Sequence, residues 1–231
     1  MTGLTALAGP LLATTAAAQS VPSPRWSLRI TPQAVVAWPS GAFGAPPADP
    51  AVHLGGFVLV RRRDSPLALR LDAGGATLRT DVSGVEVVWP TPGEQTSLQS
   101  LETGVDMDWL AGGIQWCAPE PGGGPYAFAT AGAARVHPVG DAEVAPGATV
   151  DLPGLPARST TWRIAAGAGL HFPLDREARG ALVGELEYAY GGAFDFVAAR
   201  GVDGAFPDTH YAASRARLAL LTVRFGLQAR L

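Results

Sequence analysis

The segment WSLRITPQAVVAW, residues 26 to 38, alternates between two kinds of side chain with a period of two. One alternate set is apolar throughout and consists of Trp26, Leu28, Ile30, Pro32, Ala34, Val36 and Trp38. The intervening set begins with Ser27, Arg29, Thr31 and Gln33. Because successive side chains of a β-strand point to opposite faces, the segment predicts a strand with one apolar and one polar face. Which face meets water decides between a soluble sandwich, a soluble ligand-binding barrel and a barrel in lipid.

The composition favours a β-fold with little charge. Charged residues make up 16% of the 231 residues, against about 25% in ordinary globular proteins. No internal run approaches the roughly 18 unbroken apolar residues that a membrane helix needs. The 29 Gly and 20 Pro residues fit a chain with many turns. A net charge of -3, with no basic stripe, gives no support to a nucleic-acid partner.

Residues 1 to 18 resemble a secretory signal peptide. An apolar run ends in small residues, and Ala16 to Ala18 match the expected cleavage site, although no Lys or Arg precedes the run. We expect export and a mature chain, residues 19 to 231, that forms one domain. The single cysteine, Cys117, forbids an internal disulfide, and we expect it to serve packing.

Beyond residue 20 the period of two continues over most of the chain and predicts an all-β fold. We expect eight strands, at 25–38, 52–62, 67–80, 98–116, 125–137, 160–172, 181–193 and 213–230. The connections after the first, third, fifth and seventh strands are long, and the other three are short. Long and short connections therefore leave from opposite ends, as in an antiparallel up-and-down barrel. A sandwich with Greek-key crossings would not sort its loops in this way.

Small residues on the polar faces favour a narrow barrel interior. In the sixth strand, Arg163 and His171 share a face with Gly167 and Gly169. Gly weakens a strand and packs nothing, so a face in water gains nothing from it. An eight-stranded barrel, in contrast, has room for charged side chains only when small residues lie between them. We therefore place the polar faces in the lumen and the apolar faces toward lipid, which disfavours a lipocalin-like ligand barrel.

The same alternation predicts a network of Arg and carboxylate side chains in the lumen. Its expected members are Arg29, Arg70, Asp72, Asp106, Asp108, Arg163, Glu185, Glu187 and Arg224. The charges nearly balance, which matters because an unpaired charge in a partly dry interior costs several kcal/mol. Asp106 and Asp108 could serve as a general acid and base, but a structural ion pair is the favoured interpretation.

Aromatic residues on the apolar faces predict the two membrane interfaces. Trp26 and Trp38 are 12 residues apart, which is roughly 30 Å along the membrane normal for a tilted strand. Amphipathic aromatic rings concentrate at the headgroup level. The expected aromatic girdle consists of Trp26, Trp38, Trp109, Trp162, Tyr188 and Tyr190.

The chain resembles the small outer-membrane β-barrels of the OmpA and OmpX type in four features. These are the signal-like segment, the eight alternating strands, the sorted loops and the apolar last strand, LTVRFGLQARL at residues 221 to 231. The resemblance is one of architecture and covers nearly the whole mature chain. It implies a monomer in the outer membrane of a Gram-negative-type bacterium, with both termini in the periplasm. The implied partners are outer-membrane lipids and the barrel-assembly machinery, with no cofactor. The family ends in an aromatic residue, where this chain has Leu231.

The function predicted from the sequence is a structural or surface-interaction role, without enzymatic activity. A lipid-modifying enzyme remains an alternative, on the basis of His210 and Ser214 with Asp208 nearby. In an extended segment this His and Ser lie about 13 Å apart, too far for a direct hydrogen bond. The other histidines have no metal-ligand spacing, so no metal is expected. A soluble periplasmic ligand-binding barrel is the third possibility.

Pro32 is the irregular residue of the first strand. Proline lacks the N–H donor that a closed barrel needs from each residue. The sequence therefore predicts a β-bulge or a locally unpaired carbonyl group at this position.

Overall fold

The structure is a computed structural model that describes residues 26–40, 52–62, 64–82, 100–117, 123–145, 148–151, 155–175, 179–203 and 210–231. The signal-like segment and its cleavage site lie outside these residues. In the described part of the chain, no helix is long and apolar enough to cross a membrane.

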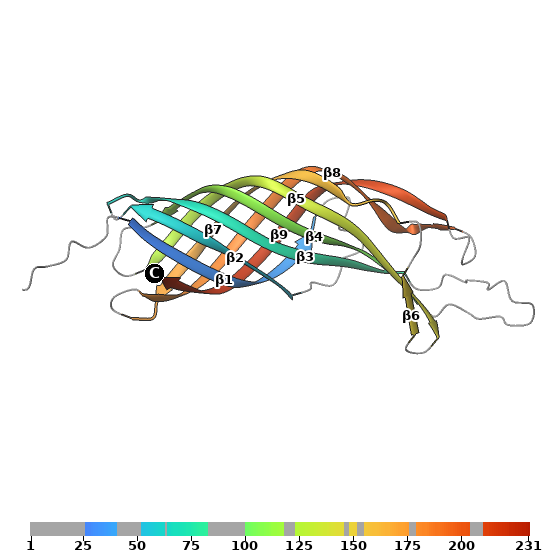
Figure 1. Cartoon of the computed structure of the whole chain (residues 1–231), viewed down its shortest axis with the longest axis horizontal. Coiled ribbons are helices and arrows are strands. Elements are labelled where there is room, and N and C mark those ends of the chain that lie inside the picture. Colours follow the sequence, from blue (N-terminus) through green and yellow to red (C-terminus); the bar gives the residue numbers. More distant parts are fainter. Residues whose placement is uncertain are drawn as a thin grey trace, which may run out of the picture.

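The described residues form nine β-strands (Figure 1). They are β1 (Trp26–Pro39), β2 (Val52–Arg62), β3 (Leu67–Val82), β4 (Ser100–Cys117), β5 (Gly124–Ala145), β6 (Ala148–Asp151), β7 (Ser159–Pro173), β8 (Gly180–Asp203) and β9 (His210–Arg230). Eight of these pair antiparallel around a ring, and the pairing of β1 with β9 closes it. The short β6 pairs with the end of β5. The predicted eight-stranded, all-β barrel is confirmed.

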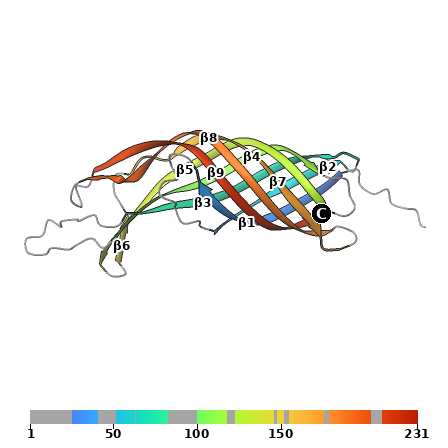
Figure 2. The same ribbon diagram turned by 180° about the vertical axis from the view of Figure 1, so that it is seen from behind.

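Several strands are longer at one end of the barrel than the sequence predicts. β5 continues to Ala145, β8 continues to Asp203, and β9 already begins at His210. The β5–β6 hairpin and the ends of β8 and β9 reach beyond the other strands, at the end opposite to the C-terminus (Figures 1 and 2). We call this the long-loop end, and the end that carries the C-terminus the short-loop end.

Pro32 lies in a strand without a bulge. β1 and β2 keep one register throughout, with Pro32 opposite Gly56. The ladder between β1 and β9 also has one register, but it skips Thr31 and Pro32. Of the two expected alternatives, the bulge is absent, and the ladder with β9 is interrupted locally at Thr31 and Pro32. The continuous pairing with β2 holds β1 in line despite the missing donor.

Two glycines allow the neighbouring strands to approach this proline. A Cβ atom at Gly226 would lie 2.4 Å from the carbonyl oxygen of Pro32. A Cβ atom at Gly56 would lie 2.5 Å from the carbonyl oxygen of Thr31. Both distances are too short for a carbon and an oxygen that are not bonded, so any larger residue would push the strands apart.

We expect Gly226→Ala to lower the free energy of unfolding by about 1–3 kcal/mol, the usual cost of overpacking. Gly112→Ala is the matched control, because a Cβ atom there meets nothing within 4 Å. Urea unfolding of the folded barrel in detergent micelles measures both variants. An equal loss of stability in the two would contradict the close approach at Pro32.

Near the short-loop end, apolar side chains face outward, and the inner face combines polar side chains with a small apolar cluster. The cluster consists of Phe57, Leu59, Ala68, Tyr126, Phe128 and Val183. Exposed residues on the outer face include Leu28, Ile30, Leu69, Leu71, Leu170, Phe172, Leu182, Leu186, Phe225 and Leu227. Buried residues on the inner face include Arg29, Gln33, Arg70, Asp72, Arg163, Glu185, Glu187, Arg224 and Gln228. This is the arrangement that the sequence predicts for β1, β3, β7, β8 and β9.

Toward the long-loop end this polarity reverses. On β4, Val105 and Met107 are buried inside the barrel, while Asp106 and Asp108 alternate with them on the outer face. On β9, Leu218 is buried and Arg217 is exposed. The interior here is an apolar core that includes Val35, Leu78, Val105, Met107, Val136, Phe194, Leu218 and Leu220. The wall at this end therefore resembles that of a water-soluble barrel, with its apolar side inward.

The predicted orientation of the fourth strand is wrong for this reason. The prediction placed Asp106 and Asp108 inside and Trp109 outside, because it assumed that the polar face of a strand is the inner face along its whole length. β4 crosses the level at which the polarity reverses. In its other half, Leu110 and Ile114 are the exposed residues on the same outer face as the two aspartates.

Cysteine labelling can test this reversal in a Cys117→Ser background. A water-soluble maleimide should label Asp108→Cys, which lies on the outer face beyond the apolar band. It should leave Met107→Cys unlabelled, because that position is buried in the interior. It should also leave Ile114→Cys unlabelled in micelles, where detergent covers the apolar band. Labelling of Met107→Cys with protection of Asp108→Cys would restore the orientation predicted from the sequence.

Candidate functional site

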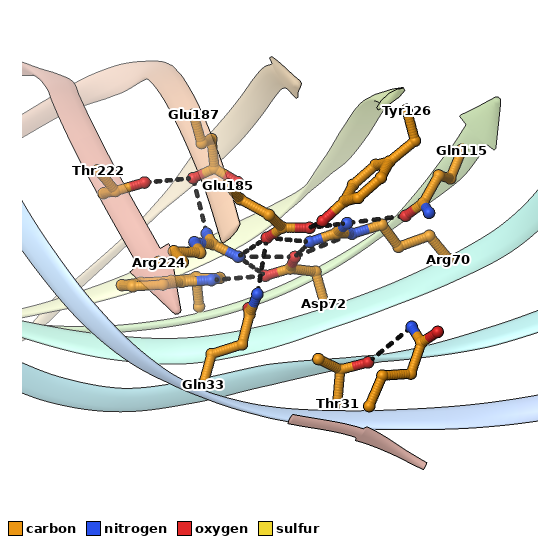
Figure 3. Close-up of polar contacts among 12 residues, drawn as sticks. Thr31, Gln33, Arg70, Asp72, Gln115, Tyr126, Glu185, Glu187, Thr222 and Arg224 are labelled. Carbon is orange, nitrogen blue, oxygen red and sulfur yellow. Dashed lines mark hydrogen bonds and ion pairs between the residues drawn. The ribbon is translucent and has the colours of Figure 1, made fainter. Parts of the chain in front are cut away.

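Six ionisable side chains form one belt across the interior, which we call the charged belt. Its members are Arg70 and Asp72 on β3, Arg163 on β7, Glu185 and Glu187 on β8, and Arg224 on β9. Each side chain is at most 1% exposed. Figure 3 shows how most of them converge from strands on different sides of the barrel. Three cations face three carboxylates, so the formal charges of the belt cancel.

Asp72 joins three strands. It accepts hydrogen bonds from Arg70 Nη2 at 2.7 Å and Nε at 3.2 Å on its own strand. Arg224 Nη1 on β9 donates to both carboxylate oxygens, at 2.8 and 3.0 Å. Trp109 Nε1 on β4 donates to Oδ1 at 3.1 Å. Both oxygens of this buried carboxylate are therefore satisfied, as burial of a charge requires.

Glu185 lies next to Asp72 and connects three further strands to the belt. Arg70 donates to it through two nitrogens, at 2.6 Å from Nη1 and 3.0 Å from Nη2. Such a two-pronged contact is the strong geometry for an Arg and a carboxylate. Gln33 on β1 donates from Nε2 at 2.9 Å, and the Tyr126 hydroxyl on β5 donates at 2.8 Å.

Glu187 joins Arg163 and Arg224 through a single oxygen. Oε1 accepts from Arg163 Nη2 and, at 2.7 Å, from Arg224 Nη2. The Thr222 hydroxyl also donates to this atom, at 3.3 Å. Arg224 thus bridges Glu187 and Asp72, and the belt is one continuous set of contacts (Figure 3).

Aromatic rings cover the guanidinium groups. The Arg70 guanidinium lies 3.8 Å from the ring centre of Phe57 and 3.9 Å from that of Phe128. The guanidinium groups of Arg163 and Arg224 lie 4.9 and 5.6 Å from the ring of Trp109. An aromatic face attracts a cation, and this attraction is larger where water is excluded. Trp109 is therefore part of the interior, and its expected place in the outer girdle is wrong.

The structure places the other expected members of the network differently. Arg29 is buried inside, but nearer the short-loop end, where Nη1 donates to Gln228 Oε1 at 3.1 Å. Asp106 lies on the outer face and accepts from the Thr77 hydroxyl at 2.6 Å. Asp108 is exposed on that same face. Seven of the nine expected charges therefore lie inside the barrel, and the two β4 aspartates do not.

The charged belt has three further partners that the alternation in the sequence does not predict, namely Tyr126, Gln115 and Thr222. Gln115 accepts from Arg70 Nη1 at 2.9 Å. A signal for Tyr126 was present on β5, where bulky Tyr126 and Phe128 alternate with the small Ala127 and Ala129. The bulky set is the inner one, because the inward glycines of β7 leave room for it: Gly169 lies opposite Tyr126 and Gly167 lies opposite Phe128.

The residues expected in the aromatic girdle divide into three groups. Trp26, Trp162 and Tyr188 are about half exposed on the outer face, at 58, 51 and 49%. Trp38 and Tyr190 are partly buried. Trp162 and Tyr190 touch edge to face, with ring centres 5.8 Å apart. Trp109, inside the barrel, is the third group.

The described residues offer little for metal or nucleophilic chemistry. Within them, no three His, Cys, Asp or Glu side chains gather as a metal site requires. Ser214 lies on β9 opposite Phe196. Asp208 and the His210 side chain, which the enzymatic alternative needs, lie outside what the structure describes.

We expect Asp72→Asn to lower the free energy of unfolding by about 3–5 kcal/mol, because Arg70 and Arg224 then lose a shared counter-charge in a buried site. Asp195→Asn is the matched control. Asp195 and Arg215 form an exposed pair 3.8 Å apart, and such pairs contribute less than about 1 kcal/mol. Urea unfolding in micelles compares the two variants. A loss in Asp72→Asn as small as in the control would show that the belt contributes no stability.

Comparison with known proteins finds no relative in sequence. No family model matches the chain. No curated protein matches it either.

Among solved structures, three matches cover most of both chains at low sequence identity. A major outer membrane protein from Thermus thermophilus has 14% identity and a TM-score of 0.47, over 88% of this chain and 99% of that chain. Neisserial surface protein A has 9% identity and a TM-score of 0.44, over 87% and 96%. Ail, the attachment invasion locus protein of Yersinia pestis, has 12% identity and a TM-score of 0.40, over 89% and 97%.

The barrel's own construction is that of a barrel that spans a membrane. Only helices and closed barrels satisfy every backbone hydrogen bond within a bilayer. This barrel is closed, its strands pair antiparallel, and an apolar band surrounds a polar interior. These are the features of transmembrane β-barrels of outer membranes. The chain therefore has the construction of a small, eight-stranded transmembrane β-barrel.

Proposed function

We propose that this outer-membrane barrel has a structural or surface-interaction role and that its lumen is plugged. The observation that supports the proposal is the charged belt, in which buried side chains from four strands meet across the interior. Between the belt and the long-loop end lies the apolar core around Val105, Met107 and Leu218. The charged belt and the apolar core therefore follow one another along the axis of the lumen.

Passage of a solute would require these contacts to break. The interior of an eight-stranded barrel is only wide enough for its own side chains. Separating a buried cation from its carboxylate costs several kcal/mol, and the belt contains several such pairs. The apolar core adds a segment in which most buried side chains are apolar and cannot replace the hydration of a solute. We therefore infer a barrel without a steady aqueous path.

The long-loop end supports a role at the cell surface. There β5, β6, β8 and β9 reach beyond the other strands (Figures 1 and 2). The outer faces of β5, β8 and β9 carry charged residues there, such as Arg135, Asp195 and Arg215. We propose that this end is extracellular and provides the interacting surface, with the C-terminus in the periplasm. Outer-membrane lipids surround the band, and the protein functions as a monomer.

Assembly by the barrel-assembly machinery is part of the same proposal. The last strand exposes Leu221, Phe225 and Leu227 on its outer face, and the chain ends in exposed Leu231. This alternation is the expected signal for the machinery.

Gel mobility and bilayer conductance test the proposal together. The unboiled, detergent-extracted protein should migrate differently from the boiled protein, and it should fractionate with outer membranes. The folded protein should give no steady conductance in a planar bilayer. A soluble periplasmic protein without a mobility shift would contradict the location. A steady open conductance from a protein that does show the shift would contradict the plugged lumen.

A further inference from the structure

The outer face of the barrel contains a groove within the apolar band. It runs across β4, β5, β7 and β8 and has a volume of about 600 Å³. Its floor is made of small residues, and its walls are made of large ones. The floor includes Ala129, Ala131 and Ala166, and the walls include Ile164, Tyr188 and Tyr190. Its shape and apolar lining suit a hydrocarbon chain that lies along the barrel wall.

An arginine lies at the end of this groove that is nearer the long-loop end. β8 runs toward that end, so Tyr190 lies above Tyr188. The Tyr190 hydroxyl accepts a hydrogen bond from Arg217 Nη1 at 2.7 Å. The ring of Tyr190 is itself fixed against Trp162. A wall residue of the groove therefore holds a cation on the outer face.

Arg217 also lies at the level where the membrane surface is expected. On β9, the outward positions below it are apolar, with Leu221 and Phe225 exposed. Above it, Arg215 is the next outward residue. The change from apolar to charged residues on the outer face marks the boundary between the hydrocarbon region and the headgroups. The groove thus lies in the hydrocarbon region, and the guanidinium lies at headgroup depth.

We propose that the groove and Arg217 form a binding site for a phosphorylated lipid of the outer leaflet. An acyl chain occupies the groove, and the lipid phosphate accepts hydrogen bonds from the Arg217 guanidinium. Arginine has five N–H donors in a fixed plane, and its hydrogen bond to Tyr190 leaves others for a phosphate. The proposal rests on the proposed place of the barrel in an outer membrane, and it names one lipid-binding position on the barrel's surface.

A second groove provides an internal control. It lies on a different part of the barrel, has a volume of about 640 Å³ and is lined by residues that include Ala34, Leu54, Phe225 and Leu227. Its lining contains no tyrosine and no charged side chain among the described residues. The two grooves therefore match in size and apolar character, but only the first has a cation beside it, Arg217 on Tyr190. We therefore expect only the first groove to prefer a lipid that carries a phosphate.

Native mass spectrometry of the folded barrel in micelles tests the cation. The probe is a diphosphorylated, hexa-acylated lipid A, and the comparison lipid is the same molecule without phosphates. Arg217→Gln should lower the affinity for the phosphorylated lipid about tenfold, the effect of losing one charge-assisted hydrogen bond. Arg215→Gln removes a neighbouring exposed cation of the same outer face and should change it less than about twofold. Equal losses in the two variants, or equal affinity for the lipid without phosphates, would overturn the proposal.

Filling each groove tests the acyl-chain part of the site. Ala166→Phe fills the first groove and should lower the affinity for lipid A. Ala34→Phe makes the same change in the second groove and should leave the affinity unchanged. An equal loss in both would show that lipid binds by general contact with the apolar band. Every variant is first checked for the mobility shift of the unboiled protein, so a failed barrel is distinguished from a failed lipid site.

Discussion

Closure of eight strands into a ring is the constraint on which the rest of this structure depends. Pairing of β1 with β9 removes the free edges, which satisfies the backbone in lipid but leaves an interior that side chains fill. A guanidinium in that space has no bulk water to solvate it, so each needs carboxylates, amides or aromatic faces nearby. Arg70, which has all three kinds of partner, is the clearest case. The equal number of cations and carboxylates in the charged belt follows from the same constraint.

The reversal of polarity along the strands adds a second level of organisation. Within the apolar band, the barrel has its polar side inward, because lipid surrounds it. Beyond the band, water surrounds the wall, so the apolar side chains turn inward and form a core around Val105 and Leu218. One strand can therefore serve both environments without changing its direction, provided that the residue types exchange faces at the boundary. Trp109 lies near this transition, with its ring against Arg163 and its N–H on Asp72.

The period of two, together with the sorted loop lengths, was sufficient to predict the barrel, its strand number and the inner face of five strands. It failed on β4, because a rule that assigns one environment to each face cannot detect a boundary within the strand. Asp106 and Asp108 are polar and alternate with apolar residues, so on sequence they are indistinguishable from Asp72. Contacts such as that of Tyr126 with Glu185 could not be predicted from the sequence either. They depend on the stagger between strands, which is defined only when the barrel closes. The absence of a bulge at Pro32 depends similarly on Gly56 and Gly226 in two other strands.

The charged belt also depends on contacts between distant parts of the chain. Asp72 and Arg224 are 152 positions apart, and Arg70 and Glu185 are 115 apart. Neither pair can form while β9 is separate from β1, because β3 and β9 face each other only across a closed lumen. In a partly closed sheet these side chains remain solvated at little cost, whereas in the closed barrel they must be paired. The belt therefore favours one register of the closing strands over others, because a shift by a single residue would turn Arg224 toward lipid and leave Asp72 and Glu187 without it.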